Sequence, residues 1–186
     1  MPWKDIPAFV QTALHTEGRY DVTRPMLEFL ILTAARSGEV RGMTWAEVDW
    51  ENAIWTIPAE RMKAQLQHRV PLSERAVTIL KNQQGWHEQL LFPSPRDQKE
   101  LSDMTLTSFL RRAEAKSDTT GRCATAHGFR SNFRDWCSEQ GYPHDLAERS
   151  LAHTVQNKVE AAYHRTDLLE QRRPLMEAWS RFIVEL

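Results

Sequence analysis

Apolar residues recur at intervals of three and four along several stretches of the chain. They fall within residues 6–14, 26–35, 73–80, 106–110 and 129–136. Side chains with this spacing share one face of a helix, so each stretch predicts an amphipathic helix. The longest pattern closes the chain, where residues 168–186 place Leu169, Met176, Trp179 and Ile183 on one side. The pattern therefore predicts a mostly helical protein.

Two short stretches are typical of strands instead. Residues 54–57 read Ile-Trp-Thr-Ile and are followed by Pro58, while residues 68–73 read His-Arg-Val-Pro-Leu-Ser. β-branched and aromatic residues favour strands, and proline ends them. The residues between, 60–67, then form the turn of a hairpin. We expect a single domain, mostly α with one small antiparallel β-sheet.

Composition narrows the class of protein without changing this fold. The chain has 186 residues, of which 41% are hydrophobic and 26% are charged, as in ordinary soluble domains. It has only two cysteines, Cys123 and Cys137, which indicates a reducing compartment rather than a disulfide framework. No apolar run approaches the length of a membrane span, and the first residues lack the layout of a signal peptide.

Charge is distributed unevenly along the chain. The net charge is −1, but residues 61–134 carry 13 basic and 7 acidic side chains, and both flanks are acidic. A DNA backbone responds to the local charge and not to the chain total. The middle of the sequence is therefore either a solvated basic surface or a surface that contacts DNA.

Four clusters of residues are candidates for chemistry. Arg36 and Glu39 lie three apart at a predicted helix end, where Glu39 either forms a surface ion pair or steadies Arg36. Lys63 lies in the predicted turn, a position where most lysines are only solvated. His127 and Arg130 also lie three apart, near a helix start, where both can meet one anion. The alternative interpretation is that His127 only caps the helix and that Arg130 is an ordinary surface arginine.

The fourth cluster is the stretch 151–165, Leu-Ala-His-Thr-Val-Gln-Asn-Lys-Val-Glu-Ala-Ala-Tyr-His-Arg. Its Tyr163 is either a packed aromatic or a nucleophile, and His153 stands ten residues before it. No serine hydrolase motif and no glycine-rich phosphate loop occurs in the chain. The histidines are not spaced as metal ligands, so a metal enzyme is disfavoured.

Taken in order, these clusters resemble the catalytic domain of the tyrosine recombinase, or phage integrase, family. The resemblance is nearest to integrases of prophages and integrative islands, and it covers nearly the whole chain. The segments IPAERMK, HRVPLS, GFRSNFRDW and RTDLLEQRRPLMEAW carry it further. One departure is Ala152, which stands where many family members have glycine. The resemblance implies the integrase catalytic-domain fold and the transfer of DNA strands through a 3′-phosphotyrosine intermediate.

The resemblance also implies a role for each candidate residue. Tyr163 is the expected nucleophile, Arg36 and Arg130 the phosphate clamp, Lys63 the general acid, His127 the general base, His153 a hydrogen-bond donor to the phosphate, and Glu39 a support behind them. No metal, cofactor or ATP is expected. Two other interpretations stay open: a DNA-binding or regulatory module of the same fold without catalysis, and a type IB topoisomerase.

Partners and location follow from the same resemblance. We expect double-stranded DNA attachment sites, a homotetramer on DNA from a chain that is monomeric alone, accessory DNA-bending proteins, and a bacterial cytoplasm with association to the nucleoid. Residues 168–186 are expected to pack either on a neighbouring protomer or on their own domain. The DNA-binding domains that precede such catalytic domains are absent from this sequence, which predicts a fragment or degenerate gene with weak DNA binding.

Overall fold

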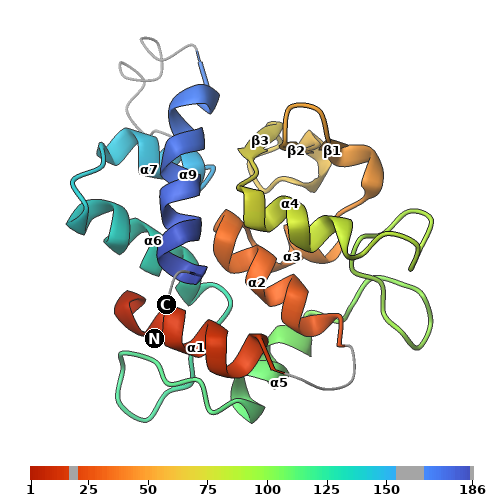
Figure 1. The fold of residues 1–186 in the computed structure, drawn as a ribbon, viewed down its shortest axis with the longest axis horizontal. Coiled ribbons are helices and arrows are strands. Elements are labelled where there is room, and N and C mark those ends of the chain that lie inside the picture. The colour runs from red at the N-terminus through yellow and green to blue at the C-terminus, as the bar shows by residue number, and fades with distance from the viewer. Residues whose placement is uncertain (17–20, 154–165, 185–186) are drawn as a thin grey trace.

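A small antiparallel sheet lies at one edge of a mostly helical fold in the computed structural model, which describes residues 1–16, 21–153 and 166–184 (Figure 1). The elements are η1 (Trp3–Asp5), α1 (Ile6–Phe9), the π-helix η2 (Val10–Leu14), α2 (Thr23–Thr33), α3 (Ser37–Arg41), η3 (Trp45–Glu47), β1 (Val48–Asp49), β2 (Ile54–Ile57), η4 (Ala59–Arg61), β3 (His68–Pro71), α4 (Glu74–Lys81), α5 (Met104–Arg112), α6 (Gly128–Glu139), α7 (His144–Ser150) and α9 (Leu169–Val184). The predicted class, mostly α with a small antiparallel sheet, is confirmed.

The sheet has three strands in the order β1-β2-β3. The predicted hairpin is confirmed, because β2 pairs antiparallel with β3 and Ile57 lies opposite His68. This register places His68 at the first position of β3, directly after the turn that contains Lys63. Strand β1 was not predicted, because its two residues are too few to show an alternating pattern.

Helix α9 lies in the middle of the fold, between α6 and α7 on one side and α2 and α4 on the other (Figure 1). Its Trp179 is fully buried and donates a hydrogen bond of 2.8 Å to the carbonyl of Ile31 in α2. The same indole packs against Trp136 of α6, with ring centroids 5.1 Å apart. The apolar side of this helix is thus covered by its own domain. The predicted contact with a neighbouring protomer stays a prediction, and it would use the polar side of α9.

The junction between α2 and α3 differs from the expected continuous helix end. Helix α2 stops at Thr33 because Ala34 adopts a left-handed conformation, with φ 49°, and ends the helix. A new short helix then begins after Arg36, which is its N-cap residue. Arg36 therefore stands at a helix start and not at a helix end.

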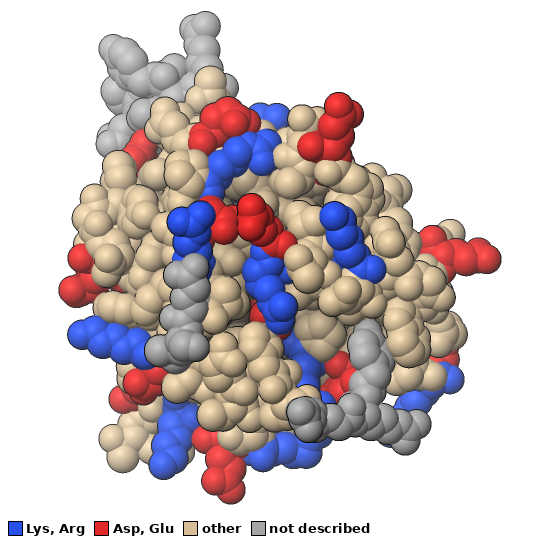
Figure 2. Space-filling model, in the orientation of Figure 1, with Lys and Arg blue, Asp and Glu red and all other residues tan. Residues whose placement is uncertain are grey.

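Charged side chains of both signs share the face shown in Figure 2, where Lys and Arg are interspersed with Asp and Glu. Several are paired across elements, as in the ion pair between Arg75 of α4 and Glu28 of α2, at 2.7 Å. Of the described helices, none has the length and apolarity that crossing a bilayer requires.

Candidate active site

Arg36 is held by Glu39 at the start of α3. One carboxylate oxygen of Glu39 accepts the backbone N–H of Arg36 at 2.7 Å, and the other accepts its guanidinium Nη1 at 2.8 Å. The Glu39 side chain is 5% exposed, whereas that of Arg36 is 28% exposed. The carboxylate thus fixes both the backbone and the head group of Arg36 and leaves part of the guanidinium accessible. This is the supporting position that the sequence predicted for Glu39.

Arg130 joins three elements from a buried position on α6. Its guanidinium donates hydrogen bonds to the carbonyls of Ala34, at 2.5 Å, and of Leu151, at 2.6 Å. The Ala34 carbonyl belongs to the turn before Arg36, so the two arginines share one neighbourhood. Burial, and then the positive charge of Arg36, lower the pKa of Arg130 to about 10. Arg130 therefore remains charged at neutral pH.

His153 follows α7 and faces the same guanidinium. Its Nε2 lies 3.2 Å from Nη2 of Arg130, and its Nδ1 lies 2.7 Å from Oε2 of Glu148. Ala152 before it has φ 50°, in the left-handed region that favours glycine. The turn forms with alanine at this position, where many family members have glycine. The structure thus brings together Arg36, Glu39, Arg130 and His153.

Lys63 and His127 lie nearby, exposed to solvent. Lys63 stands in the turn between β2 and β3, between Met62 and Ala64, which both line a pocket shared with His153. His127 is the N-terminal boundary of α6, and its carbonyl accepts the backbone N–H of Arg130 at 3.1 Å. Within the described ranges, no side-chain hydrogen bond or ion pair joins Lys63 or His127 to Arg36, Arg130 or His153. Their catalytic roles therefore stay predictions.

Tyr163, the predicted nucleophile, lies outside the described residues. The nearest described residues on either side of it in the sequence, His153 and Thr166, line the same pocket. The role of Tyr163 stays a prediction that rests on the sequence.

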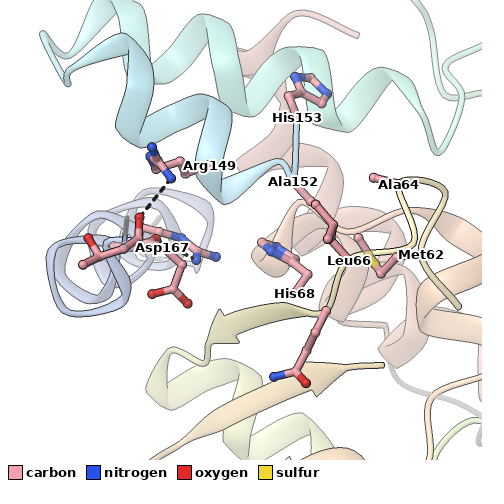
Figure 3. Close-up of a pocket in the computed structure, with 11 residues that line it drawn as sticks. Met62, Ala64, Leu66, His68, Arg149, Ala152, His153 and Asp167 are labelled. Atoms are coloured by element: carbon pink, nitrogen blue, oxygen red, sulfur yellow. Dashed lines mark hydrogen bonds between the residues drawn. The ribbon is translucent and has the colours of Figure 1, made fainter. Parts of the chain in front are cut away.

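This pocket has a volume of about 300 Å³ and opens between the β2–β3 turn, the end of α7 and the start of α9 (Figure 3). The turn contributes Met62, Ala64 and Leu66, whereas Arg149 and Asp167 come from the other wall. Arg149 donates a hydrogen bond of 2.9 Å to the carbonyl of Thr166, which ties the two helical walls together. The pocket is thus lined by both apolar and polar side chains, and it shares His153 with the cluster around Arg130.

His68 and Arg172 line this pocket too, and no motif in the sequence indicates a role for either. Burial, and then the positive charges of Arg172, Arg130 and Arg36, lower the pKa of His68 to about 3. His68 is therefore neutral at physiological pH, and the three guanidiniums near it favour this neutral form. The only signal in the sequence was its place at the start of a predicted strand beside the Lys63 turn, and that position does not predict burial.

The arrangement is suited to holding an anion. Two guanidiniums, of Arg36 and Arg130, are fixed by hydrogen bonds to a carboxylate and to backbone carbonyls before any ligand binds. Guanidinium forks match the oxygens of a phosphoryl group, and donors fixed in advance stabilise negative charge that develops on them. In the described part of the chain, no three His, Cys, Asp or Glu side chains are grouped so that they could hold a metal ion.

Comparisons with known proteins identify the family of this chain. The family model for the phage integrase family matches residues 3–169. Prophage integrase IntA of Escherichia coli K12 is 35% identical over 164 residues, which cover 87% of this chain and 38% of IntA. The chain thus spans well under half of that relative's length.

Solved structures show the same fold. An integrase from mycobacterium phage Brujita superposes with a TM-score of 0.70 and 18% identity, over 97% of this chain and 59% of that one. A lambda integrase tetramer bound to a Holliday junction gives a TM-score of 0.64 and 18% identity, over 85% of this chain and 47% of that one. The fold expected from the resemblance is therefore confirmed.

Proposed function

The chain belongs to the phage integrase family, and we propose that it is the catalytic domain of a site-specific DNA recombinase. The observation that carries the proposal is the convergence of Arg36, Glu39, Arg130 and His153, which come from α3, α6 and the end of α7. In the proposed reaction, one DNA strand is cleaved and rejoined by transesterification, without a metal ion or ATP. One phosphodiester replaces another of similar energy, so no external energy source is required.

In the first step, the Tyr163 hydroxyl oxygen attacks the scissile phosphorus. A bond forms between the phenolic oxygen and phosphorus, and the bond from phosphorus to the 5′-oxygen breaks. The product is a 3′-phosphotyrosine and a free 5′-hydroxyl. A 5′-hydroxyl from another strand then reverses the step. The covalent intermediate divides one exchange into two similar displacements.

Proton transfers accompany this step. A tyrosine with the ordinary pKa of about 10 is ionised in only about one molecule in a thousand at pH 7, a handicap of roughly 4 kcal/mol. A base near the hydroxyl is therefore useful, and His127 has this role in the proposal. Lys63 gives a proton to the departing 5′-oxygen. Both side chains are exposed, Lys63 lies between two residues that line the pocket, and His127 precedes Arg130 by three residues, which supports this assignment.

Negative charge develops on the non-bridging oxygens as the phosphorus becomes pentavalent. Arg36 and Arg130 are the proposed clamp for this charge, and His153 donates a further hydrogen bond to it. Their fixation by Glu39 and by backbone carbonyls supports the proposal, because donors held in place need no reorganisation during the reaction.

We further propose that the partner is double-stranded DNA at attachment sites, in a bacterial cytoplasm, with accessory DNA-bending proteins. The lambda integrase of similar fold forms a tetramer on a Holliday junction, and a homotetramer on DNA is proposed here from a chain that is monomeric alone. The exposed side of α9, including the pair Arg173 and Glu170 at 3.0 Å, is the surface available to a neighbouring protomer. Replacing the exposed Glu170 and Arg173 with alanine and finding unchanged cooperative assembly on DNA would remove that part of the proposal.

The test is covalent capture of DNA. The chain is mixed at high concentration, with a metal chelator present, with a pool of nicked duplexes of random sequence around the nick. The nick lets the short 5′-hydroxyl strand diffuse away, so the intermediate accumulates and is seen by denaturing electrophoresis. We expect a covalent adduct in the wild type and in Tyr142→Phe, whose ring only stacks on Trp136 with centroids 5.4 Å apart. We expect none in Tyr163→Phe.

Other outcomes have definite meanings. A chain that binds the pool without forming any adduct is the non-catalytic DNA-binding module. An adduct that requires Mg²⁺, or that persists in Tyr163→Phe, contradicts the mechanism. An adduct in which the strand reseals freely about its own nick, without exchange between duplexes, favours the topoisomerase alternative.

A further inference from the structure

Glu148 occupies a position behind His153 that the proposed reaction does not use. It lies on α7, and its side chain is 17% exposed. One of its carboxylate oxygens lies 2.7 Å from Nδ1 of His153, and the other lies 2.8 Å from Nε of Arg134 on α6. His144, one turn earlier on α7, is more distant at 3.8 Å.

The backbone brings the two side chains together. The N–H of His153 donates to the carbonyl of Glu148 at 3.0 Å, across the left-handed turn at Ala152. This turn folds the chain back, so that residues five apart meet on one side. The same turn exposes the Leu151 carbonyl, which accepts from Arg130. The imidazole is therefore bounded by a carboxylate on one side and a guanidinium on the other.

The hydrogen-bonding partners decide which nitrogen of His153 carries the proton. A guanidinium has donors but no acceptor, so Nε2 of His153, 3.2 Å from Nη2 of Arg130, accepts a hydrogen bond. Nδ1 must then carry the hydrogen of the neutral ring, and it donates to the Glu148 carboxylate. This is the opposite of the tautomer that a neutral histidine side chain favours in water. Glu148 and Arg130 thus both select one tautomer and one ring orientation.

Glu148 also suits the state with bound DNA. When a phosphoryl group recruits the Arg130 guanidinium, His153 can donate to the phosphate only if Nε2 is protonated. With Nδ1–H already present, the ring then carries a positive charge. A carboxylate 2.7 Å from Nδ1 offsets this charge, as outer carboxylates do for other functional imidazoles.

We propose that Glu148 is a positioning residue for His153: it fixes the ring as the Nδ1–H tautomer and supports its protonation against phosphate. The inference rests on the proposed function only for its effect on cleavage, because the tautomer is a property of the free chain. The competing explanation is that Glu148 merely ties α7 to α6 through Arg134. Arg134→Gln is therefore the matched control, since it removes this tie and leaves the contact to His153.

The direct measurement is long-range ¹H–¹⁵N NMR of the chain labelled in its histidine rings, at mildly alkaline pH where the rings are neutral. The His153 signals are identified by their loss in His153→Gln. We expect the Nδ1–H pattern in the wild type and in Arg134→Gln, and a shift toward the Nε2–H pattern in Glu148→Met, which keeps the side-chain size. An Nε2–H pattern in the wild type, or the same pattern in Glu148→Met as in the wild type, overturns the proposal.

The second measurement is the rate of covalent adduct formation at saturating DNA. Glu148→Met should slow it roughly tenfold or more, the effect typical of losing an outer partner that orients a functional imidazole. The dissociation constant of Glu148→Met for DNA should stay within about threefold of the wild type. The rate of adduct formation in Arg134→Gln should also stay within about threefold of the wild type. Equal losses in Glu148→Met and Arg134→Gln would show a structural tie instead. If neither the wild type nor any variant forms an adduct, the proposed function fails. The NMR result still decides the tautomer of His153.

Discussion

Arg130 and Arg172 are buried and hydrogen-bonded in the same way but lie in different surroundings. Both are almost completely buried, and each donates to two backbone carbonyls, Ala34 and Leu151 for Arg130, Asp167 and Arg69 for Arg172. Burial, the first cause in both, lowers each pKa to about 10. Both also leave Nε buried without a hydrogen-bond partner among the described residues.

Their surroundings separate them. Arg130 lies beside Arg36 and His153, whose side chains are partly exposed and so accessible to a ligand. Arg172 instead fastens the start of α9 to β3, next to the ion pair of Arg69 and Asp167. Burying an arginine against carbonyls is therefore a way to fix its position, and it does not by itself indicate a functional site. The accessible donors Arg36 and His153 beside Arg130 distinguish a functional arginine from a structural one.

The largest expected effect tests whether Arg130 acts on the phosphate. Arg130→Lys keeps a positive charge but loses the planar fork, so adduct formation should fall on the order of 10²–10³-fold. Arg172→Lys should change this rate by less than about threefold. The measurement is a single-turnover time course with the nicked DNA pool. Equal losses in the two variants would mean that the pocket needs both arginines and that the distinction drawn from their surroundings is wrong.

The next effect tests Arg172 as a structural anchor. Arg172→Met should lower the free energy of unfolding by about 3 kcal/mol, because the carbonyls of Asp167 and Arg69 lose their partner at roughly 1–3 kcal/mol each. The adjacent Arg173 pairs with Glu170 at 3.0 Å on the outer side of the same helix. Arg173→Met is therefore the control and should cost less than about 1 kcal/mol. Urea denaturation measures both, and similar losses would contradict the anchor.

The sequence distinguished these two arginines only in part. Arg130 was found because His127-Gly-Phe-Arg130 resembles a family motif, and α6 was predicted from its own periodicity. Arg172 sits on a helix that was also predicted, yet its burial depends on β3, which is 103 residues away along the chain. Helical periodicity reports which residues share a face, but not which strand will cover a charged one.

The same limit applies elsewhere in the site. The pairing of Arg36 with Glu39 followed from their spacing of three, and the structure confirms it. The helix break at Ala34 was missed, because a left-handed alanine has no signature comparable to glycine. The partial burial of His68 was missed for the reason given for Arg172: it depends on packing between segments that are distant in the sequence.

His68 experiences the positive charge of both arginines and gives a prediction of intermediate size. Its pKa is about 3 in the folded chain, because of burial and then Arg172, Arg130 and Arg36, against about 6.5 in the unfolded chain. The unfolded state therefore binds a proton that the folded state does not between these values. This contribution to stability is complete above about pH 6.5 and is lost as the pH falls toward 3, at up to about 1.4 kcal/mol per pH unit.

Replacing His68 removes this dependence. Between pH 7 and pH 5, the free energy of unfolding should fall by roughly 2 kcal/mol more in the wild type than in His68→Gln. His144→Gln, at an exposed position on α7, is the control and should keep the wild-type slope. Urea denaturation across this pH range measures the difference. Identical slopes for the wild type and His68→Gln would mean that His68 is solvated rather than enclosed by the arginines.

The smallest expected effect tests what holds the start of α9 in place. The candidates are the buried hydrogen bonds from Arg172 to backbone carbonyls and the ion pair beside them. Arg69 and Asp167 form a two-bond fork, with both distances 2.8 Å, and their side chains are 42% and 36% exposed. A double-mutant cycle of Arg69→Gln and Asp167→Asn should give a coupling of about 0.5–1 kcal/mol at low salt and less at high salt. Both values come from urea denaturation. If this coupling exceeds the loss in free energy of unfolding in Arg172→Met, the exposed pair of Arg69 and Asp167 anchors α9 more strongly than Arg172 does. The stability of α9 would then not explain why Arg172 is buried.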